Sequence, residues 1–468
     1  GGGGGGGGGN SRNALPEGTT REVWDTHESV LVPPPGGADG AAALARAAAR
    51  PRVQVRALDP LAQRVLAGVD SLNPIQTAVH RCALYSSENM LVCAPTGAGK
   101  TNVALMAICQ QLRAHVQADG VLDLSKVRIV YIAPMKALAA EVASKMSAAL
   151  RPLALRVREF TGDMQLTRRE VAETQMLVTT PEKWDVVTRK GADALAGHAG
   201  LLILDEVHLL HDDRGAVLEA VVARTLRLVE SAQVQVRLLG LSATLPNYVD
   251  VALFLRVNLK TGLFFFDASY RPVPLTQEYV GVKVNNPMRR VQVMTDLAYE
   301  RVLAAARAGK QAMVFVHARN DTARTARALR DLAVAEGDLS AIAPDPDHPR
   351  LEAAKRDVAR CRSAEVRFLF PAGLGIHHAG MLRSDRNLTE RLFAEGLIRC
   401  LVCTATLAWG VNLPAHTVII KGTQIYNPQK GAHVELSPLD VMQIFGRAGR
   451  PQFDTSGTGV IITTHDKL

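Results

Sequence analysis

Short, uninterrupted apolar runs alternate with longer segments of helical periodicity along most of the chain from Leu72 onward. The runs are apolar at consecutive positions, whereas a strand with one face in water would alternate apolar and polar residues. Uninterrupted strands separated by helices are typical of a parallel sheet that is covered on both faces. The pattern predicts strands at residues 90–93, 129–132, 176–178, 201–204 and 237–241 and helices at residues 101–112, 137–150 and 216–230.

This rhythm is interrupted near Arg271-Pro-Val-Pro274 and then resumes. The resumed pattern predicts a helix at residues 293–308 and strands at residues 313–316, 397–403 and 417–421. An alternation of strands and helices on both sides of a break indicates two consecutive α/β domains. They are expected at residues 59–265 and 283–468, with a linker at residues 266–282.

Two other segments depart from the alternating pattern. Residues 331–365 contain three prolines and are predicted to be a surface insertion with a little helix. Residues 1–58 contain a run of nine glycines and Pro33-Pro-Pro35, and are predicted to be a flexible N-terminal extension. Because the chain begins with Gly1 rather than Met, we expect it to be a segment of a longer protein.

Composition narrows the class of protein. A hydrophobic fraction of 47% excludes a mainly disordered chain, and a net charge of +9 favours a polyanionic partner such as nucleic acid. The six cysteines are scattered and do not resemble a secreted disulfide framework. Cys400 and Cys403 belong to an expected buried strand without a second pair, so neither zinc nor redox chemistry is predicted. No apolar run approaches the roughly 18 residues of a membrane span, and no membrane partner is expected.

A phosphate-binding loop is predicted where the first expected strand passes into a helix. The segment APTGAGKT (94–101) has Ala94 in place of the first glycine of the general pattern. Backbone N–H groups of such a loop close around phosphate oxygens, while Lys100 would reach the β and γ phosphates and Thr101 would ligate Mg²⁺. The alternative is a glycine-rich turn without a ligand. The expected ATP site consists of Pro95, Thr96, Gly97, Ala98, Gly99, Lys100 and Thr101.

An acidic pair follows the apolar run at residues 201–204. Carboxylates that leave the C-terminal end of a parallel strand lie where such sheets bind ligands. Asp205 is expected to hold Mg²⁺, and Glu206 to orient and deprotonate the attacking water. Alone, such a pair is more often a helix N-cap. About 100 residues after a phosphate loop, it indicates ATP hydrolysis.

A basic segment, QIFGRAGR (443–450), lies in the second expected domain. The planar guanidinium of arginine donates paired hydrogen bonds and stays charged, which suits it to a γ-phosphate. Arg447 and Arg450 are therefore candidates for arginine fingers that make hydrolysis depend on domain closure. In isolation, the segment would be only a basic turn.

Taken in chain order, these motifs resemble those of the superfamily 2 nucleic-acid helicases, from about residue 60 to the end. The corresponding segments are LNPIQ (72–76), APTGAGKT (94–101), APMK (133–136), TTPE (179–182), DEVH (205–208), SAT (242–244), VFVHAR (314–319), HAGM (378–381), TATLAWG (404–410) and QIFGRAGR (443–450).

Within that superfamily, GRAGRPQFD (446–454), HDDRG (211–215) and TATLAWGVNLPAH (404–416) are similar to the Ski/Brr-type branch. Two families of the branch share many of these blocks. The helicase subunits of the activating signal cointegrator complex are more similar than the spliceosomal U5 helicases, for example at LPEG (15–18) and TGDMQL (161–166).

The resemblance implies two tandem RecA-like domains, use of ATP and Mg²⁺, and 3′-to-5′ movement on single-stranded or partly duplex RNA or DNA. It also implies a subunit of a larger, ribosome-associated complex that acts in DNA alkylation repair and ribosome quality control, in the nucleus or the cytoplasm. Two alternatives stay open. One is a spliceosomal RNA helicase, and the other is a nucleotide-dependent scaffold that does not unwind.

The resemblance also assigns roles to single residues. Gln76 would read the adenine edge, Ser242 and Thr244 would couple hydrolysis to domain movement, and Gln443 would position the phosphate site. Gly410 and Asn412 would lie near the nucleotide. The residues expected to contact the nucleic-acid backbone are Pro134, Lys136, Thr180, Arg319 and Thr404.

A hairpin is predicted between the motifs at 404–416 and 443–450, because residues 421–436 contain two β-rich stretches around a Pro/Gly turn. In the similar helicases a hairpin at this place splits the duplex. We therefore hypothesise that residues 427–433 form such a wedge, the alternative being a surface ornament.

Overall fold

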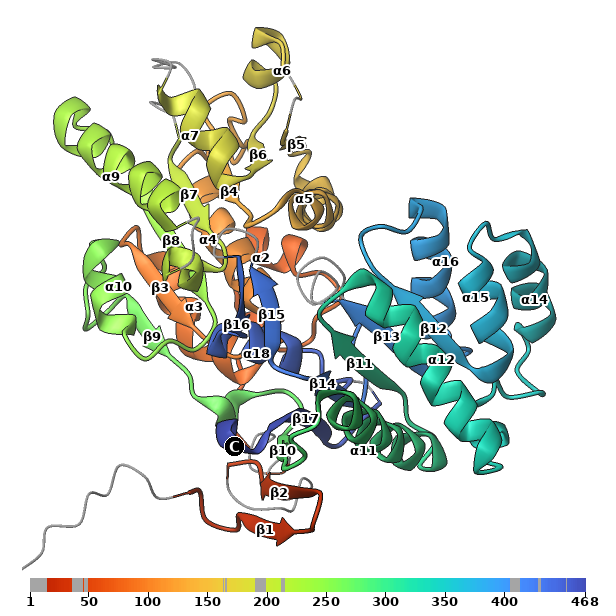
Figure 1. The fold of residues 1–468 in the computed structure, drawn as a ribbon. Coiled ribbons are helices and arrows are strands. Elements are labelled where there is room, and N and C mark those ends of the chain that lie inside the picture. Colours follow the sequence, from red (N-terminus) through yellow and green to blue (C-terminus); the bar gives the residue numbers. More distant parts are fainter. Residues whose placement is uncertain are drawn as a thin grey trace, which may run out of the picture. The chain divides into compact units, whose positions relative to one another are not determined.

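The computed structural model describes residues 15–35, 45, 49–162, 164, 166–189, 199–211, 215–404, 413–427, 431–451 and 453–468. These residues form two compact units. The first unit comprises residues 46–272, and the second combines residues 1–45 with residues 273–468. Each unit contains its own sheet with helices on both faces (Figure 1).

The sheet of the first unit has seven strands in the order β5-β6-β4-β7-β8-β3-β9, and all neighbouring pairs are parallel. All five strands expected from the apolar runs are present. The strands are β3 (Met90–Cys93), β4 (Ile129–Ile132), β5 (Val157–Phe160), β6 (Met176–Thr179), β7 (Leu201–Leu204), β8 (Arg237–Ser242) and β9 (Leu263–Phe265). The α-helices are α2 (Pro60–Val65), α3 (Pro74–Tyr85), α4 (Lys100–Arg113), α5 (Lys136–Leu150), α6 (Arg168–Ala172), α7 (Pro181–Arg189), α9 (Gly215–Ala232) and α10 (Tyr248–Phe254).

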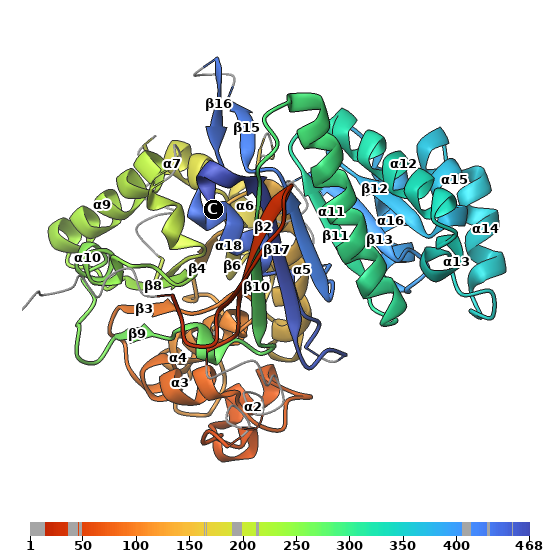
Figure 2. The same cartoon turned by 60° about the horizontal axis from the view of Figure 1, so that its bottom comes forward.

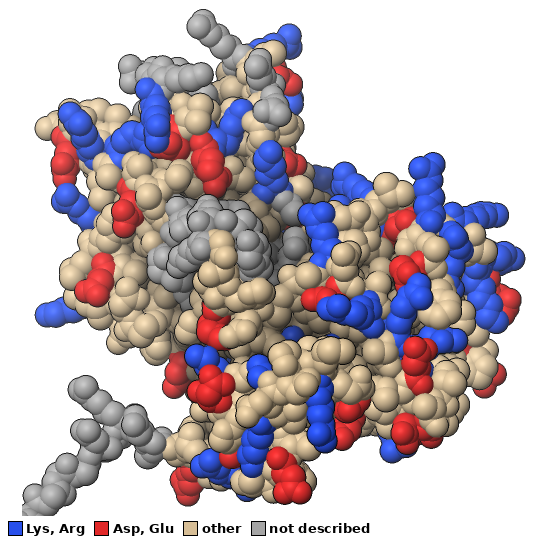
Figure 3. Space-filling view, viewed as in Figure 1, with Lys and Arg blue, Asp and Glu red and all other residues tan. Residues whose placement is uncertain are grey.

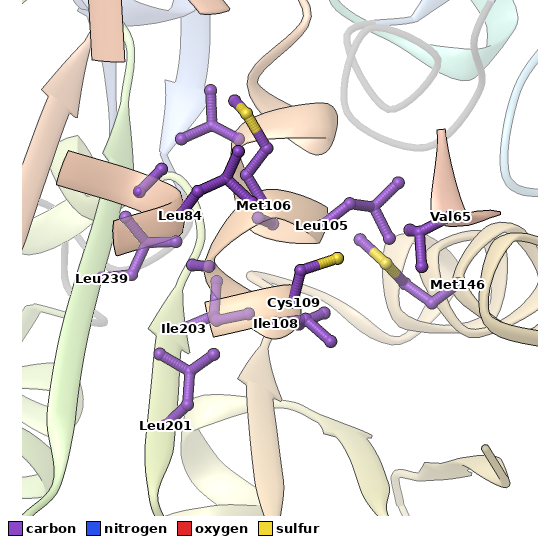
Figure 4. Packing of buried hydrophobic residues seen from close by; sticks show 14 of the residues in the cluster. Val65, Leu84, Leu105, Met106, Ile108, Cys109, Met146, Leu201, Ile203 and Leu239 are labelled. Atoms are coloured by element: carbon purple, nitrogen blue, oxygen red, sulfur yellow. The ribbon is translucent and has the colours of Figure 1, made fainter. Parts of the chain in front are cut away.

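Strand β7 explains why the runs are apolar without interruption. Leu201 and Ile203 belong to the core beneath α2–α5, which Figure 4 shows together with Met106 of α4. Leu202 and Leu204, at the alternate positions, belong to the core beneath α7, α9 and α10. Since successive side chains of a strand point to opposite faces, both faces of this sheet are buried.

A buried arginine joins this sheet to the end of α3. Arg237 is 4% exposed, and its guanidinium donates to the carbonyl oxygens of Cys82 at 2.9 Å, Ala83 at 3.0 Å and Glu88 at 2.8 Å. Carbonyls in the last turn of a helix have no partner within the helix, so a buried cation there satisfies them. Burial lowers the pKa of Arg237.

The sheet of the second unit has eight strands in the order β1-β2-β10-β17-β14-β11-β13-β12. The strands β10, β17, β14, β11, β13 and β12 are parallel to one another. The strands of this unit are β1 (Thr20–Val23), β2 (His27–Val32), β10 (Leu275–Val282), β11 (Ala312–Val316), β12 (Leu374–His377), β13 (Cys400–Thr404), β14 (Thr417–Lys421), β15 (Gln424–Asn427), β16 (Ala432–Glu435) and β17 (Gly457–Thr464). The α-helices are α11 (Pro287–Arg307), α12 (Arg319–Ala335), α13 (Leu339–Ile342), α14 (Leu351–Arg360), α15 (Ala364–Leu369), α16 (Arg383–Ala394) and α18 (Pro438–Phe445).

The N-terminal extension is not flexible throughout, which corrects the expectation for residues 1–58. Strand β2 pairs antiparallel with β10, and β1 pairs with β2 at the edge of the sheet. Ser29 donates to Glu278 at 2.9 Å, and His465 lies 3.1 Å from the buried carboxylate of Glu28. These contacts join residues that are hundreds of positions apart, so local composition could not reveal them.

The expected linker is also wrong over much of its length. Strand β10 lies in the middle of the sheet, between β2 and β17, and therefore belongs to the second unit. The expected insertion at residues 331–365 consists mostly of helices that contribute to the cores. Ala333 and Ile342 pack beneath one face of the sheet, and Leu351 and Val358 beneath the other.

Removing β1 and β2 is expected to destabilise the second unit, because β10 would become an edge strand with unpaired backbone groups. We expect a chain that begins at residue 36 to lose about 2 kcal/mol of stability, which lowers the unfolding midpoint by roughly 4–8 °C. A chain that begins at residue 15 is the control and should unfold like the full chain. Differential scanning calorimetry compares the three, and equal midpoints would show that the two strands contribute nothing.

Candidate nucleotide and nucleic-acid sites

The predicted phosphate loop connects β3 to α4. Gly97 and Gly99 have φ angles of +78° and +84°, which glycine adopts without strain. Helix α4 begins at Lys100 without a side-chain cap, so the positive end of the helix faces the loop. The ammonium of Lys100 donates to the carbonyl oxygens of Ala94 at 2.9 Å and Pro95 at 3.3 Å. The loop therefore presents the donors that a phosphate needs.

Gln76 holds this loop from the start of α3. Asn73 caps α3, and its side chain also donates to the carbonyl of Ala98 at 2.9 Å. The amide of Gln76 donates to the carbonyl of Gly99 at 3.1 Å and accepts from the backbone of Asn73 at 3.1 Å. A Cβ at Gly99 would lie 2.5 Å from the Gln76 amide nitrogen, so only glycine fits. Adenine recognition by Gln76 stays a prediction.

The acidic pair lies at the end of β7. Asp205 accepts hydrogen bonds from the hydroxyl of Tyr131 at 2.6 Å and from the backbone of Glu206 at 3.0 Å. Burial and the neighbouring Glu206 raise the pKa of Asp205 to about 6. The Tyr131 hydroxyl favours the ionised carboxylate, and it also fixes its orientation. Sequence reasoning missed Tyr131, whose only signal is a polar tip within an otherwise aliphatic strand.

A histidine links the acidic pair to the predicted coupling segment. Nδ1 of His208 lies 3.3 Å from the Glu206 carboxylate and accepts a hydrogen bond from the backbone of Ala243 at 3.2 Å. Ser242 is buried, and its hydroxyl lies 3.5 Å from the same nitrogen. The carbonyl of Ser242 also accepts from the backbone of Ala94, at 3.0 Å. The phosphate loop and the coupling segment are therefore hydrogen-bonded to each other, and His208 lies between the coupling segment and the acidic pair, whereas Thr244 is only half-buried beside them.

Three of the predicted nucleic-acid contacts lie together in the first unit. Pro134, Lys136 and Thr180 line one hollow of about 580 Å³. Lys183 lies in the same hollow and was not predicted, and its ammonium donates to the carbonyl of Gly162 at 3.0 Å. These side chains follow β4 and β6, which are adjacent parallel strands, so the hollow is at their carboxyl ends. The arrangement presents two ammonium groups to a chain of phosphates.

The other two predicted contacts are in the second unit. Arg319 begins α12 directly after β11, and Thr404 ends the adjacent strand β13. Val316 and Thr404 are partners in the strand register, so these positions lie at one edge of the sheet. The Arg319 guanidinium lies along Gly380, where a Cβ would be 3.2 Å from it.

Arg450 is one of the two arginines of the second unit that were predicted to contact phosphate, and an ion pair holds it in place. Its guanidinium donates to both carboxylate oxygens of Asp454, at 2.9 and 3.1 Å, and to Gln311 at 3.0 Å. Lys310 donates to Asp454 at 2.8 Å. Although burial opposes ionisation, these bonds lower the pKa of Asp454 to about 2. Arg450 therefore has a structural role that the motif did not indicate.

The remaining predicted residues are less well defined. Gln443 is buried in α18, and the carbonyl of Arg447 accepts from Ala415 at 2.9 Å. Gly410 and Asn412 lie outside the described residues. Cys400 and Cys403 are free and buried in β13. Among the residues described, no group of three or more His, Cys, Asp or Glu side chains could hold a metal ion.

The basic charge is not confined to these sites. Figure 3 shows Lys and Arg side chains gathered over α14–α16 of the second unit. Arg360 of α14 and Arg391 of α16 line a hollow of their own. Net charge therefore indicates an acidic partner without locating its site. In the described part of the chain, no helix has the length and apolar character needed to cross a bilayer.

Comparison with known proteins identifies the two halves of the site separately. The DEAD/DEAH box helicase family matches residues 73–251, and the helicase conserved C-terminal domain matches residues 356–452. The crystal structure of the DUF1998 helicase MrfA bound to DNA has a TM-score of 0.62 at 18% identity, covering 89% of this chain and 49% of that one. The expected α/β class with RecA-like domains is thereby confirmed.

Two curated relatives are similar over 97% of the chain. Activating signal cointegrator 1 complex subunit 3 of Homo sapiens is 56% identical over 456 residues, which are 20% of its length. The DExH-box ATP-dependent RNA helicase DExH14 of Arabidopsis thaliana is 54% identical over 456 residues, which are 21% of its length. The chain therefore spans about a fifth of the length of these relatives.

Replacing Asp454 with asparagine should destabilise the second unit, because Arg450 and Lys310 would keep their charges without a counterion. We expect a loss of about 2–3 kcal/mol at pH 7. A carboxyl group whose pKa is lowered by folding stabilises the fold at pH values above its pKa in the unfolded chain, which is near ~4. The loss of stability in the variant should therefore shrink as the pH falls from about 4 toward 2. Urea unfolding measures it, with Asp357→Asn as the exposed control; equal losses in both variants would contradict the assignment.

Proposed function

Because the chain belongs to the ATP-dependent helicases of superfamily 2, we propose that it uses ATP and Mg²⁺ to move 3′-to-5′ along a nucleic-acid strand and to separate duplexes. The observation that carries this proposal is the network of the first unit. In it, the backbone of Ala94 in the phosphate loop donates to the carbonyl of Ser242, and His208 lies between the backbone of Ala243 and the carboxylate of Glu206. A protein that only binds nucleotide does not need that connection.

Asp205 supports a divalent cation at this site. Its carboxylate is half-buried next to Glu206, and desolvation together with the repulsion between the two carboxylates raises its pKa. Oxygen ligands from Asp205 and Thr101 are of the kind that Mg²⁺ prefers. Bound there, Mg²⁺ would neutralise charge on the β and γ phosphates.

The chain's own residues would then carry out hydrolysis. Lys100 exchanges the loop carbonyls for phosphate oxygens, and Tyr131 keeps the Asp205 carboxylate in place. Glu206 takes the proton of the attacking water. Loss of the γ-phosphate changes what Glu206 contacts, and His208 passes that change to the backbone of Ala243.

The protein is proposed to contact the sugar-phosphate backbone of the nucleic-acid strand. The hollow formed by Pro134, Lys136 and Thr180 in the first unit offers ammonium and hydroxyl groups, and Arg319 offers a guanidinium in the second. Such donors suit phosphates and sugars of any sequence. Binding should therefore be independent of sequence and weaken with salt.

The hairpin expected from the sequence is present, and we propose that it is the wedge that splits the duplex. Strands β15 and β16 pair antiparallel, with Ile425 opposite Val434 and Asn427 opposite Ala432. Figure 2 shows the pair standing out from the sheet of the second unit. The turn of the hairpin, residues 428–430, lies outside the described residues.

The cellular setting is proposed from the relatives. One curated relative is named as a subunit of the activating signal cointegrator 1 complex, which supports membership of a larger complex. We further propose that this complex is ribosome-associated and acts in ribosome quality control and DNA alkylation repair, in the nucleus or the cytoplasm. Another relative is named an RNA helicase, which keeps a spliceosomal RNA duplex as the alternative substrate. ATPase assays with single-stranded RNA, single-stranded DNA and ribosomes separate these settings.

The function is tested by the ATPase rate with and without single strands. We expect single strands to stimulate ATP hydrolysis by the wild type. Glu206→Gln should still bind ATP, but its turnover should fall about 10²- to 10⁴-fold because the general base is removed. The exposed Glu219→Gln on α9 is the control and should behave as wild type. Normal turnover in Glu206→Gln would remove Glu206 as the base. A wild type that binds ATP without strand-stimulated turnover would favour the scaffold.

The wedge is tested by shortening the hairpin. Joining Tyr426 to His433 through Asn-Gly keeps a two-residue turn that suits a hairpin and removes the tip. We expect unwinding of a duplex with a 3′ overhang to fall roughly tenfold or more, while ATPase stimulation by single strands persists. The control is the same variant assayed on single strands alone. Unwinding at the wild-type rate would make the hairpin a surface ornament.

A further inference from the structure

A second cavity lies at the carboxyl ends of three neighbouring strands of the second unit. Strands β17, β14 and β11 are parallel and adjacent, and the cavity beyond them has a volume of about 260 Å³. The starts of α11 and α12 form its walls, and so do Thr423 and Gln424 at the foot of the hairpin. Ligands of parallel α/β sheets bind at this edge.

Among the Lys, Arg, Asp and Glu side chains that line the cavity, cations outnumber carboxylates. Arg290, Arg324 and Lys421 line the cavity with a single carboxylate, that of Asp321. Arg324 is paired with Asp321, and Arg290 donates to the carbonyl of Val284 at 2.9 Å. Both arginines therefore already have acceptors in the protein, which leaves Lys421 as the residue to examine.

Lys421 is a largely buried cation with few acceptors. It ends β14, and its ammonium donates to the hydroxyl of Thr325 at 3.2 Å, its only hydrogen-bond acceptor among the described residues. Burial lowers the pKa of Lys421 to about 8, with Asp321 and Asp296 opposing that effect and Arg324 adding to it. An ammonium has three donors, so a bound anion would satisfy those that Thr325 leaves.

The chemistry of the lining favours a phosphate over a base. No Phe, Tyr or Trp is among the described residues that line the cavity, so it offers no aromatic ring for a base to stack on. Lysine binds phosphate as a compact point charge. The hydroxyls of Thr463 and Thr464, at the end of β17, also line the cavity, where they are paired with Thr423 and Asp466.

The cavity lies apart from the residues of the second unit that are proposed above to contact the nucleic-acid strand. Arg319 leans from the start of α12 toward Gly380, which follows β12 on one side of β11. Asp321 and Thr325, on the same helix, face Lys421 of β14 on the other side of β11. The two nucleic-acid strands of a duplex that is split at the hairpin could therefore follow opposite sides of α12.

We propose that this cavity binds a backbone phosphate of the strand displaced at the hairpin, with Lys421 as its charged ligand. The proposal rests on the wedge function given above. It predicts that the displaced strand adds affinity of its own to a fork, and that this added affinity depends on Lys421.

The test uses the 468-residue chain and two duplexes with the same 3′ overhang, of which only one carries a 5′ arm on the displaced strand. Without ATP, the wild type should bind the armed fork roughly two- to fivefold more tightly. Lys421→Met keeps the side-chain length and removes the charge, and it should bind both duplexes equally. The slope of log affinity against log salt on the armed fork should fall by about 0.7–0.9. Lys355→Met, on α14, is the control and should keep the preference.

A second measurement uses the wild type alone, so that it does not depend on the folding of a variant. Acylation of lysine amines followed by peptide mass spectrometry should show Lys421 protected by the armed fork and not by the unarmed one. Equal protection by both forks, or a loss of affinity for both duplexes in Lys421→Met, would overturn the proposal. Either result would mean that the cavity binds the strand along which the protein moves. An armed fork that gains no affinity in the wild type would also overturn it. If single strands neither bind nor stimulate ATP hydrolysis, the proposed function fails instead.

Discussion

A parallel sheet has to bury both of its faces, and this constraint determines where each unit can carry out chemistry. In β7, alternate leucine and isoleucine side chains fill two different cores, so no position along the strand is available to a ligand. Only the loops at the carboxyl ends of the strands remain available to bind a ligand. The phosphate loop, the acidic pair and the hollow beside Lys136 are all at such ends, although they come from four different strands. The cavity beside Lys421 occupies the same edge of the other sheet.

Two aspartates show how environment separates a predicted metal ligand from a structural carboxylate. Asp454 is surrounded by Arg450 and Lys310, its pKa is about 2, and its charge is already balanced. Among the described residues, Asp205 accepts hydrogen bonds from a hydroxyl and a backbone N–H, beside a second carboxylate, and its pKa is about 6. The first therefore stabilises the fold, whereas the second is left receptive to a cation. The residue type is the same, and the partners decide the role.

The sequence predicted those parts of the structure whose signal is local. The apolar runs located five of the seven strands of the first unit because both faces of the sheet are buried, and the hairpin was recognisable from its turn. Strand β10 was mistaken for a linker because the prolines of Arg271-Pro-Val-Pro274 precede it and because polar residues interrupt its apolar positions. Glu28, Arg237 and Tyr131 could not be assigned, since each acts through a partner that is distant along the chain. The motifs identified residue types for the site, but the contacts of Gln76 and Arg450 with their own units needed coordinates.

Glu206 has a backbone φ of +54°, in the left-handed region where a residue with a side chain is strained by about 1–2 kcal/mol. Glycine would relieve that strain at this position. Strained backbone of this kind is found where a side chain is kept for function, which agrees with the role proposed for Glu206. Replacing Glu206 by glycine would therefore remove the proposed base and the backbone strain together, so stability and turnover would change in opposite directions.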